Sequence, residues 1–226
     1  MKIKAIKAII TGSTGMVGEG VLRVCLNSDA VKNVLVINRK PCHVIHPKLK
    51  EIIREDFMDW TGIEDELEGY NACFFCLGVS SIRMPADRYY ELTYTLTLKL
   101  AAVLSERNPD MTFCYISGAG TDSTEKGSSK WAKVKGKTEN DLMKLPFGEV
   151  YAFRPGFIKP IEGLVHTQPF YKYIGWLFPV GRAVYPNGFC TLQEVGESMI
   201  NAATWGYTKK ILEGRDIIQL ARLNAG

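Results

Sequence analysis

Three glycines at a three-residue spacing give the clearest indication of chemistry in this sequence. Gly12, Gly15 and Gly18 follow an apolar run, and apolar residues then recur at helical spacing, which predicts a buried strand, a turn and a helix. In that context the glycines allow a sharp turn, close approach of a pyrophosphate and tight helix packing. We therefore predict a dinucleotide-binding turn with the phosphates at the helix amino terminus. The expected contacts are Gly12, Ser13, Thr14, Gly15, Met16, Val17 and Gly18.

The end of the second predicted strand indicates which nucleotide is preferred. Dehydrogenases that prefer NAD usually carry Asp or Glu there, because a carboxylate binds the hydroxyls of the adenosine ribose. This chain has Asn38, Arg39 and Lys40 instead. A guanidinium can hold a 2′-phosphate and no carboxylate repels it, so we expect NADP(H) to be preferred over NAD(H). The alternative is that Arg39 and Lys40 belong to a solvated loop.

Strand and helix patterns alternate along the chain, which predicts an α/β protein with a doubly wound parallel sheet (Rossmann) and a small C-terminal cap. We expect a single nucleotide-binding domain over residues 1–226, in which residues 157–226 contribute the cap on the substrate side. The strands predicted after the first cover residues 33–38, 51–54, 72–77, 112–116 and 149–153. The later predicted helices cover residues 87–107, 129–144 and 191–203, the last opened by a capping box at Thr191 and Glu194.

Composition limits the classes of function. The chain has 226 residues, 46% of them hydrophobic, which is enough for a substantial core. The net charge is +4 with scattered basic residues, so we expect no nucleic-acid partner. No stretch approaches the roughly 18 apolar residues of a membrane span. The basic start is followed by too short an apolar run for a signal peptide, and we expect a cytoplasmic protein.

The six cysteines do not indicate a metal centre. Cys73 and Cys76 have the two-residue gap of a zinc pair, but they lie within an apolar run that predicts a buried strand. Strand residues three apart point to opposite faces and cannot hold one ion together. We therefore expect free thiols and no metal.

The chain resembles the atypical short-chain dehydrogenase/reductases, near their Tat-interacting-protein-like and NAD-dependent epimerase-like members. The resemblance covers nearly the whole chain and rests on TGSTGMVG (11–18), EDF (55–57), CLG (76–78), YISGAG (115–120), WAKVKG (131–136) and FRPGFI (153–158). The cofactor contacts that it implies are Asp56 and Phe57 at the adenine, Leu77 and Gly78 at the adenosine ribose, and Pro155, Gly156 and Phe157 at the nicotinamide.

The catalytic helix departs from the family pattern. Active members carry Tyr-x-x-x-Lys, and this chain has Trp131 and Lys135 at that spacing, one helical turn apart on one face. In the family the lysine binds the nicotinamide ribose and the phenol relays a proton. Lys135 can still hold the ribose. The indole of Trp131 can orient a carbonyl or stack on a substrate, but it has no useful acidity.

The polarising serine of the family is represented here by Ser117, which follows the fifth predicted strand. Its hydroxyl could polarise a substrate carbonyl or bond the backbone of its own loop. Ser123 could also enter the site from that loop. Thr93, where relatives place a polar relay residue, could instead be a helix-packing hydroxyl.

The C-terminal third is aromatic, which allows an apolar substrate pocket. The alternative is ordinary packing of a short cap, with an exposed remnant available for a homodimer contact or for lipid. The aromatic residues in question are Phe157, Phe170, Tyr171, Tyr173, Trp176, Phe178 and Tyr185.

Two functions stay open at this point. One is an NADP(H)-dependent oxidoreductase or epimerase-like enzyme acting on a small carbonyl or alcohol, with the proton supplied by another tyrosine. The other is a catalytically silent protein that senses NADP(H), which the replacement of tyrosine by Trp131 favours. The candidate tyrosines are Tyr89, Tyr90, Tyr94 and Tyr173.

Overall fold

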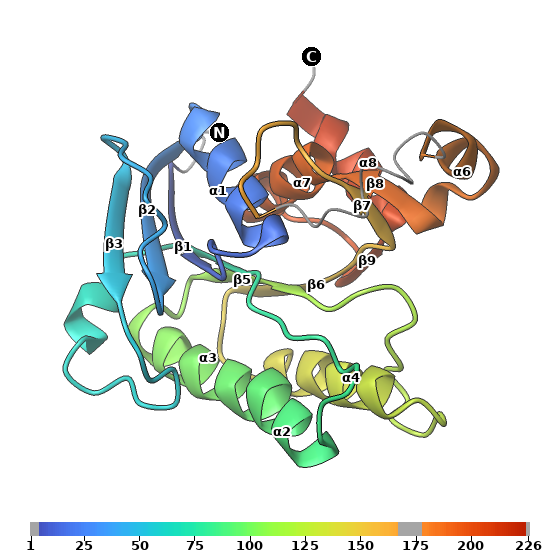
Figure 1. Ribbon diagram of the computed structural model, residues 1–226. Helices are drawn as coiled ribbons and strands as arrows, with labels where there is room; N and C mark the ends of the chain where they lie inside the picture. Colours follow the sequence, from blue (N-terminus) through green and yellow to red (C-terminus); the bar gives the residue numbers. More distant parts are fainter. Residues whose placement is uncertain (1–4, 167–177, 225–226) are drawn as a thin grey trace.

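The computed structural model describes residues 5–166 and 178–224, which contain a seven-stranded sheet (Figure 1). The strand order is β3-β2-β1-β4-β5-β6-β9, and every neighbouring pair is parallel. The order reverses between β1 and β4, which is where open α/β sheets place a ligand. The strands are β1 (Ile6–Thr11), β2 (Val31–Asn38), β3 (Leu49–Ile53), β4 (Ala72–Phe75), β5 (Thr112–Ile116), β6 (Glu149–Arg154) and β9 (Ile211–Glu213).

Helices cover both faces of this sheet. Figure 1 shows α1 (Met16–Asn27), α7 (Leu192–Trp205) and α8 (Gly214–Ala221) on one side. The other side carries α2 (Ala86–Tyr90), α3 (Leu96–Arg107) and α4 (Lys130–Leu142). Side chains alternate between two hydrophobic clusters: Ala8 and Ile10 of β1 join the α1 and α7 side, and Ile9 joins the α3 side. The predicted doubly wound sheet is confirmed.

The long predicted helix over residues 87–107 contains a π-helical turn. That turn spans Glu91–Thr95 and joins α2 to α3. Thr93 is buried within it, and its carbonyl accepts a hydrogen bond from the Thr97 hydroxyl at 2.6 Å. Turns of this type often lie beside functional sites, and this one faces α4.

The C-terminal region, expected as one cap, divides in two. α7, β9 and α8 belong to the main sheet and its helical layer, and the predicted capping box of Thr191 and Glu194 is confirmed. Among the described residues, β7 (Phe157–Lys159), β8 (Phe189–Thr191) and α6 (Phe178–Val184) lie apart from it, as a second parallel pair of strands with a short helix.

Aromatic rings hold this cap together. Phe157 lies 6.2 Å from Phe178 and 5.7 Å from Phe189 between ring centroids, and Arg182 of α6 donates to Glu194 of α7 at 2.8 Å. The predicted cap residues Phe170, Tyr171, Tyr173 and Trp176 lie outside the described residues. In the part of the chain that the structure describes, no helix has the length and apolar character needed to cross a membrane.

Candidate nucleotide site

The glycine turn links β1 to α1 with no room for side chains at two of its positions. Gly12 has a φ of +75°, and a Cβ there would lie 2.8 Å from the backbone nitrogen of Leu77. A Cβ at Gly18 would overlap the carbonyl oxygen of Gly12. A Cβ at Gly15 would meet only the Gly12 oxygen, at 3.5 Å. The space in front of Gly15 is therefore open, which fits a pyrophosphate at the α1 amino terminus.

A buried hydrogen-bond network lies beneath this turn. The Ser13 hydroxyl donates to the Asn38 side-chain oxygen at 2.9 Å, and the Asn38 amide donates to Glu51 at 2.8 Å. Glu51 also accepts from the Cys42 N–H at 2.9 Å. Ser13 and Asn38, both predicted nucleotide contacts, thus use their side chains to fix the turn to β2 and β3. Arg39, the next residue, is exposed.

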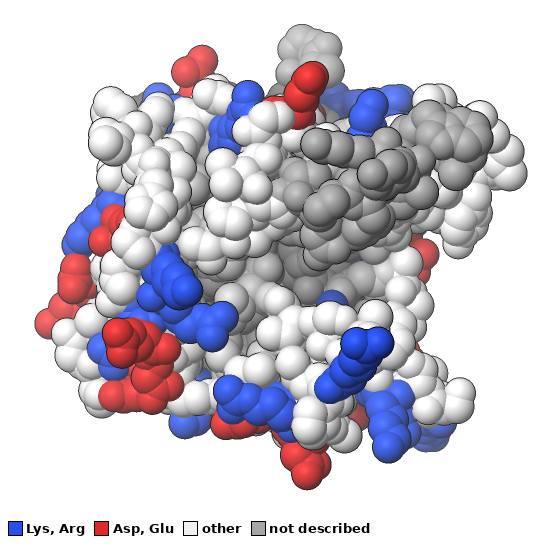
Figure 2. Space-filling view, viewed as in Figure 1, with Lys and Arg blue, Asp and Glu red and all other residues white. Residues whose placement is uncertain are grey.

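A cavity of about 370 Å³ collects the residues expected at the adenosine. Asp56 accepts the Met58 N–H at 2.7 Å, and Phe57 is buried against Trp60 with ring centroids 5.3 Å apart. Both signs of charge gather near the ends of β2 and β3 on the face seen in Figure 2. The predicted residues in the cavity wall are Arg39, Asp56, Phe57, Leu77 and Gly78.

Two charged residues of this cavity lie on the long predicted helix, and sequence reasoning did not place them at the site. Arg88 of α2 and Glu91 of the π-helical turn line it and form an ion pair at 2.5 Å. Their spacing of three residues on a helix was a signal for the pair. Nothing in the sequence pattern indicated that this helix would turn them toward the adenosine end.

Lys135 is the residue expected at the nicotinamide end of the candidate site. Its ammonium group donates to the carbonyl oxygen of Ser117, so α4 is attached to the end of β5. Burial lowers the pKa of Lys135 to about 8, and the opposing attraction of Glu139, one turn later, is weaker. Trp131, one turn earlier, is partly buried, and a Cβ at Gly120 would lie 3.5 Å from its ring.

The hydroxyl of Ser117 is engaged with the backbone. It donates to the carbonyl oxygen of Phe153 at 3.1 Å, and the Ser117 N–H donates to the same oxygen at 2.9 Å. Ser117 is 4% exposed. Of the two roles considered for this serine, the geometry favours the structural one.

A buried ion pair that sequence reasoning missed lies behind Lys135. Arg154 donates from Nε to Glu139 at 3.0 Å, and its Nη2 donates to Glu139 and to the Ser123 hydroxyl. Both partners are buried. Arg154 directly precedes Pro155, whose carbonyl accepts the Ala119 N–H at 2.9 Å. The pair therefore ties α4 to the segment expected at the nicotinamide.

Three of the four candidate tyrosines lie on α2 and the π-helical turn. The Tyr94 hydroxyl donates to Asp141 at 2.8 Å, and burial and that carboxylate raise the pKa of Tyr94. Tyr89 is buried, and its burial raises its pKa. Tyr90 lies beside Tyr94, with ring centroids 4.8 Å apart. Tyr173 lies outside the described residues.

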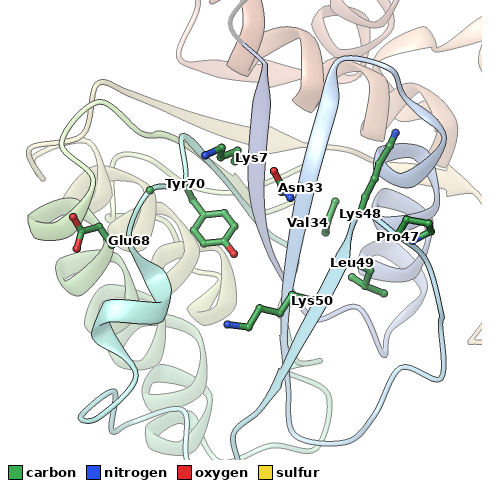
Figure 3. Close-up of a pocket in the computed structure, with 10 residues that line it drawn as sticks. Lys7, Asn33, Val34, Pro47, Lys48, Leu49, Lys50, Glu68 and Tyr70 are labelled. Carbon is green, nitrogen blue, oxygen red and sulfur yellow. The ribbon is translucent and has the colours of Figure 1, made fainter.

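A second cavity, of about 330 Å³, opens at the other edge of the sheet (Figure 3). Lys7, Lys48, Lys50 and Tyr70 line it, near the amino ends of β1 to β3. Lys48 donates to the carbonyls at the end of α1, and Lys50 pairs with Glu66 at 2.6 Å. Since ligands of open α/β sheets bind at the carboxyl edge, this cavity is not the nucleotide site.

The parallel sheet and glycine turn define a Rossmann-type α/β protein. Residues 8–134 match the NAD dependent epimerase/dehydratase family, and the chain belongs to that family. This confirms the resemblance seen in the motifs. The matched segment ends one residue before Lys135.

Two named relatives align with most of this chain. "Protein FMP52-1, mitochondrial" of Scheffersomyces stipitis is 28% identical, with 94% of this chain and 97% of the relative covered. "Protein fmp52-2, mitochondrial" of Aspergillus oryzae is 25% identical, with 95% and 96% covered. These names contradict the cytoplasmic location expected from the sequence, and that prediction was wrong. The residues that speak against a secretory signal peptide and a membrane span carry no information on import into mitochondria.

Solved structures share the fold. WbmF of Bordetella bronchiseptica, in complex with NAD+, has a TM-score of 0.64 at 16% identity, with 98% of this chain and 79% of that chain covered. A UDP-N-acetylglucosamine 4-epimerase of Methanobrevibacter ruminantium M1 has a TM-score of 0.63 at 15% identity, with 96% and 81% covered. At these identities the likeness shows the fold alone.

Proposed function

We propose that the protein is an NADP(H)-dependent oxidoreductase of its family that acts on a small carbonyl or alcohol. The observation that carries the proposal is the 370 Å³ cavity, which brings Arg39 together with residues that follow β3 and β4. WbmF, a protein of the same fold, is known in complex with NAD+, which supports a nicotinamide nucleotide here. The open space at Gly15 would accept the pyrophosphate between the adenosine end and the nicotinamide end of the site.

The preference for NADP(H) rests on charge at the end of β2. Arg39 is exposed and forms no ion pair within residues 5–166 and 178–224, so its guanidinium is available to a 2′-phosphate. The carboxylate of Glu51, the acidic group closest to the Asn38 amide, is held by that amide and by the Cys42 N–H. Glu55 also lines the cavity and is the residue that would favour NAD(H).

The bound nicotinamide would supply or accept a hydride, and the chain's own residues would hold it. Arg39 would bind the 2′-phosphate on the adenosine ribose, and the turn at Gly15 would bind the pyrophosphate. Lys135 of α4 would hold the nicotinamide ribose. The Arg154–Glu139 pair fixes the strand end that precedes Pro155.

Titration calorimetry tests cofactor choice. NADPH should bind more tightly than NADH, and Arg39→Ala should weaken NADPH binding by roughly 1.5–3 kcal/mol while leaving NADH unchanged, because a charged hydrogen-bonded contact is lost. Arg107→Ala is the matched control, since Arg107 is an exposed arginine at the end of α3 and pairs with Asp65. Equal affinities of the unmodified protein for both nucleotides would contradict the NADP(H) preference.

Nucleotide sensing without turnover is the second candidate, and Trp131 favours it. A protein of this kind would bind NADPH and reduce nothing. Turnover with aldehydes, ketones and quinones separates the candidates: measurable oxidation of NADPH supports the oxidoreductase, and binding with no oxidation across the panel supports the sensor.

A further inference from the structure

One partly buried amine lies on the helix face where the family has its phenol. Lys135 is one turn beyond Trp131 on α4, and its ammonium donates to the Ser117 carbonyl at the end of β5. An ammonium group has three protons, so this contact leaves two for other acceptors. Lys135 therefore combines a fixed position with free donor capacity.

Neighbouring groups that could release a proton are unsuited or already used. The Trp131 indole N–H has no useful acidity. The Ser117 hydroxyl donates to the Phe153 carbonyl, and the Tyr94 hydroxyl donates to the Asp141 carboxylate. Of Trp131, Ser117, Tyr94 and Lys135, only Lys135 keeps a transferable proton that these contacts do not use.

The charges around Lys135 suit proton release. Glu139 lies one turn further along α4, and Arg154 of β6 binds its carboxylate from the other side. This guanidinium offsets the carboxylate, so Glu139 stabilises the ammonium less than a free carboxylate would. Burial consequently dominates and lowers the pKa of Lys135 to about 8, close to the pH at which a general acid is most effective.

We infer that Lys135 gives the proton to the substrate oxygen in the reduction, taking over the task of the missing phenol; this inference rests on the oxidoreductase function proposed above. The carbonyl carbon receives a hydride from C4 of the reduced nicotinamide, and the C=O π pair moves onto oxygen. That oxygen forms an O–H bond with a proton from Nζ. Lys135, left as a neutral amine, regains a proton from water. In alcohol oxidation each transfer runs in reverse.

The pH dependence of turnover in both directions tests this. With NADPH and 4-nitrobenzaldehyde or 9,10-phenanthrenequinone, kcat should fall about tenfold per pH unit above pH 8, as the ammonium is lost. With NADP+ and 4-nitrobenzyl alcohol, kcat should rise through the same pH. Lys135→Arg keeps a cation that can donate to Ser117 but releases no proton in this range, so kcat should drop at least about 100-fold. Lys133→Arg, elsewhere on α4, should keep the unmodified kcat and pH profile.

A direct measurement of the lysine separates proton transfer from positioning. In protein labelled with ¹³C,¹⁵N-lysine, one Nζ resonance should titrate near pH 8 and be absent from Lys135→Arg. Turnover retained by Lys135→Arg, or a Lys135 midpoint near 10.5, would overturn the inference and leave the oxidoreductase function intact. NADPH binding without turnover of any probe would instead remove the oxidoreductase function, and the role of Lys135 with it.

Discussion

The adenosine end and the nicotinamide end of the candidate site are built differently. At the adenosine end, Arg39 and Asp56 are exposed on loops that follow individual strands, and they line an open cavity. At the proposed nicotinamide end, Lys135 of α4 donates to the Ser117 carbonyl just after β5, and Arg154 of β6 donates to Glu139 of α4. The first end follows from local motifs. The second depends on pairings between distant parts of the chain.

Gly15→Val would break the shared middle of the site, and its effect should be the largest. The open space at Gly15 is where we propose that the backbone approaches the pyrophosphate, and an isopropyl group would fill it. We expect calorimetry to detect no NADPH binding, with a circular-dichroism spectrum that stays folded. If Gly15→Val still bound NADPH, the nucleotide would lie elsewhere in the protein. The comparison of an adenosine end with a nicotinamide end would then no longer apply.

Glu139→Ala should destabilise the nicotinamide end. It leaves the buried Arg154 guanidinium without its carboxylate, which typically costs about 3–5 kcal/mol of unfolding free energy. Urea denaturation measures the loss. The double variant Glu139→Leu with Arg154→Met should recover most of it, because neither charge is then buried. A single-variant loss below about 1 kcal/mol would show that this end is not held by the pair.

The sequence predicted the nucleotide half of the fold well because its signals are local. The glycine turn, the apolar strands and the capping box at Thr191 each depend on residues within a few positions of one another. The alternation of strands and helices is also a local signal, and it predicted that the strands of the sheet are parallel. Cavity residues such as Phe57 and Leu77 came from family resemblance, and the structure places them together.

Contacts between distant segments had no such signal. β7, β8 and β9 have three residues each, too short for a period-two pattern to be visible. The Glu139–Arg154 pair joins residues 15 apart in sequence, and the Ser13–Asn38 bond joins residues 25 apart. The π-helical turn at Glu91–Thr95 could not be predicted either, because its residues are of types that also occur in ordinary α-helices.

Trp131→Tyr would sharpen the comparison by restoring the family pattern at the nicotinamide end. A phenol one turn before Lys135 supplies a second acid, and general acids typically contribute about 10²–10⁴-fold. We expect kcat for 4-nitrobenzaldehyde with NADPH to rise at least tenfold, less than that full range because Lys135 already acts and a phenol leaves a gap beside Gly120. NADPH affinity should stay unchanged, since the adenosine end is untouched. An unchanged kcat would mean that this face of α4 does not meet the substrate.

Asp141→Asn should have the smallest effect, and it tests whether Tyr94 is held as a structural group. Burial raises the pKa of Asp141, but hydrogen bonds from Lys137, Lys144 and Tyr94 outweigh it and bring the pKa below its ordinary value of 3.8. A carboxylate whose pKa is lowered by folding contributes stability above its unfolded pKa and loses it as the pH falls through the folded pKa. Because Lys144 is largely exposed and Lys137 is partly exposed, the contribution should be about 0.5–1 kcal/mol. Urea denaturation should therefore show the unmodified protein more stable than Asp141→Asn at pH 7, with the difference shrinking toward pH 2. A difference that is the same at both pH values would show that the charge of Asp141 does not hold Tyr94, and the phenol would return as a rival to Lys135.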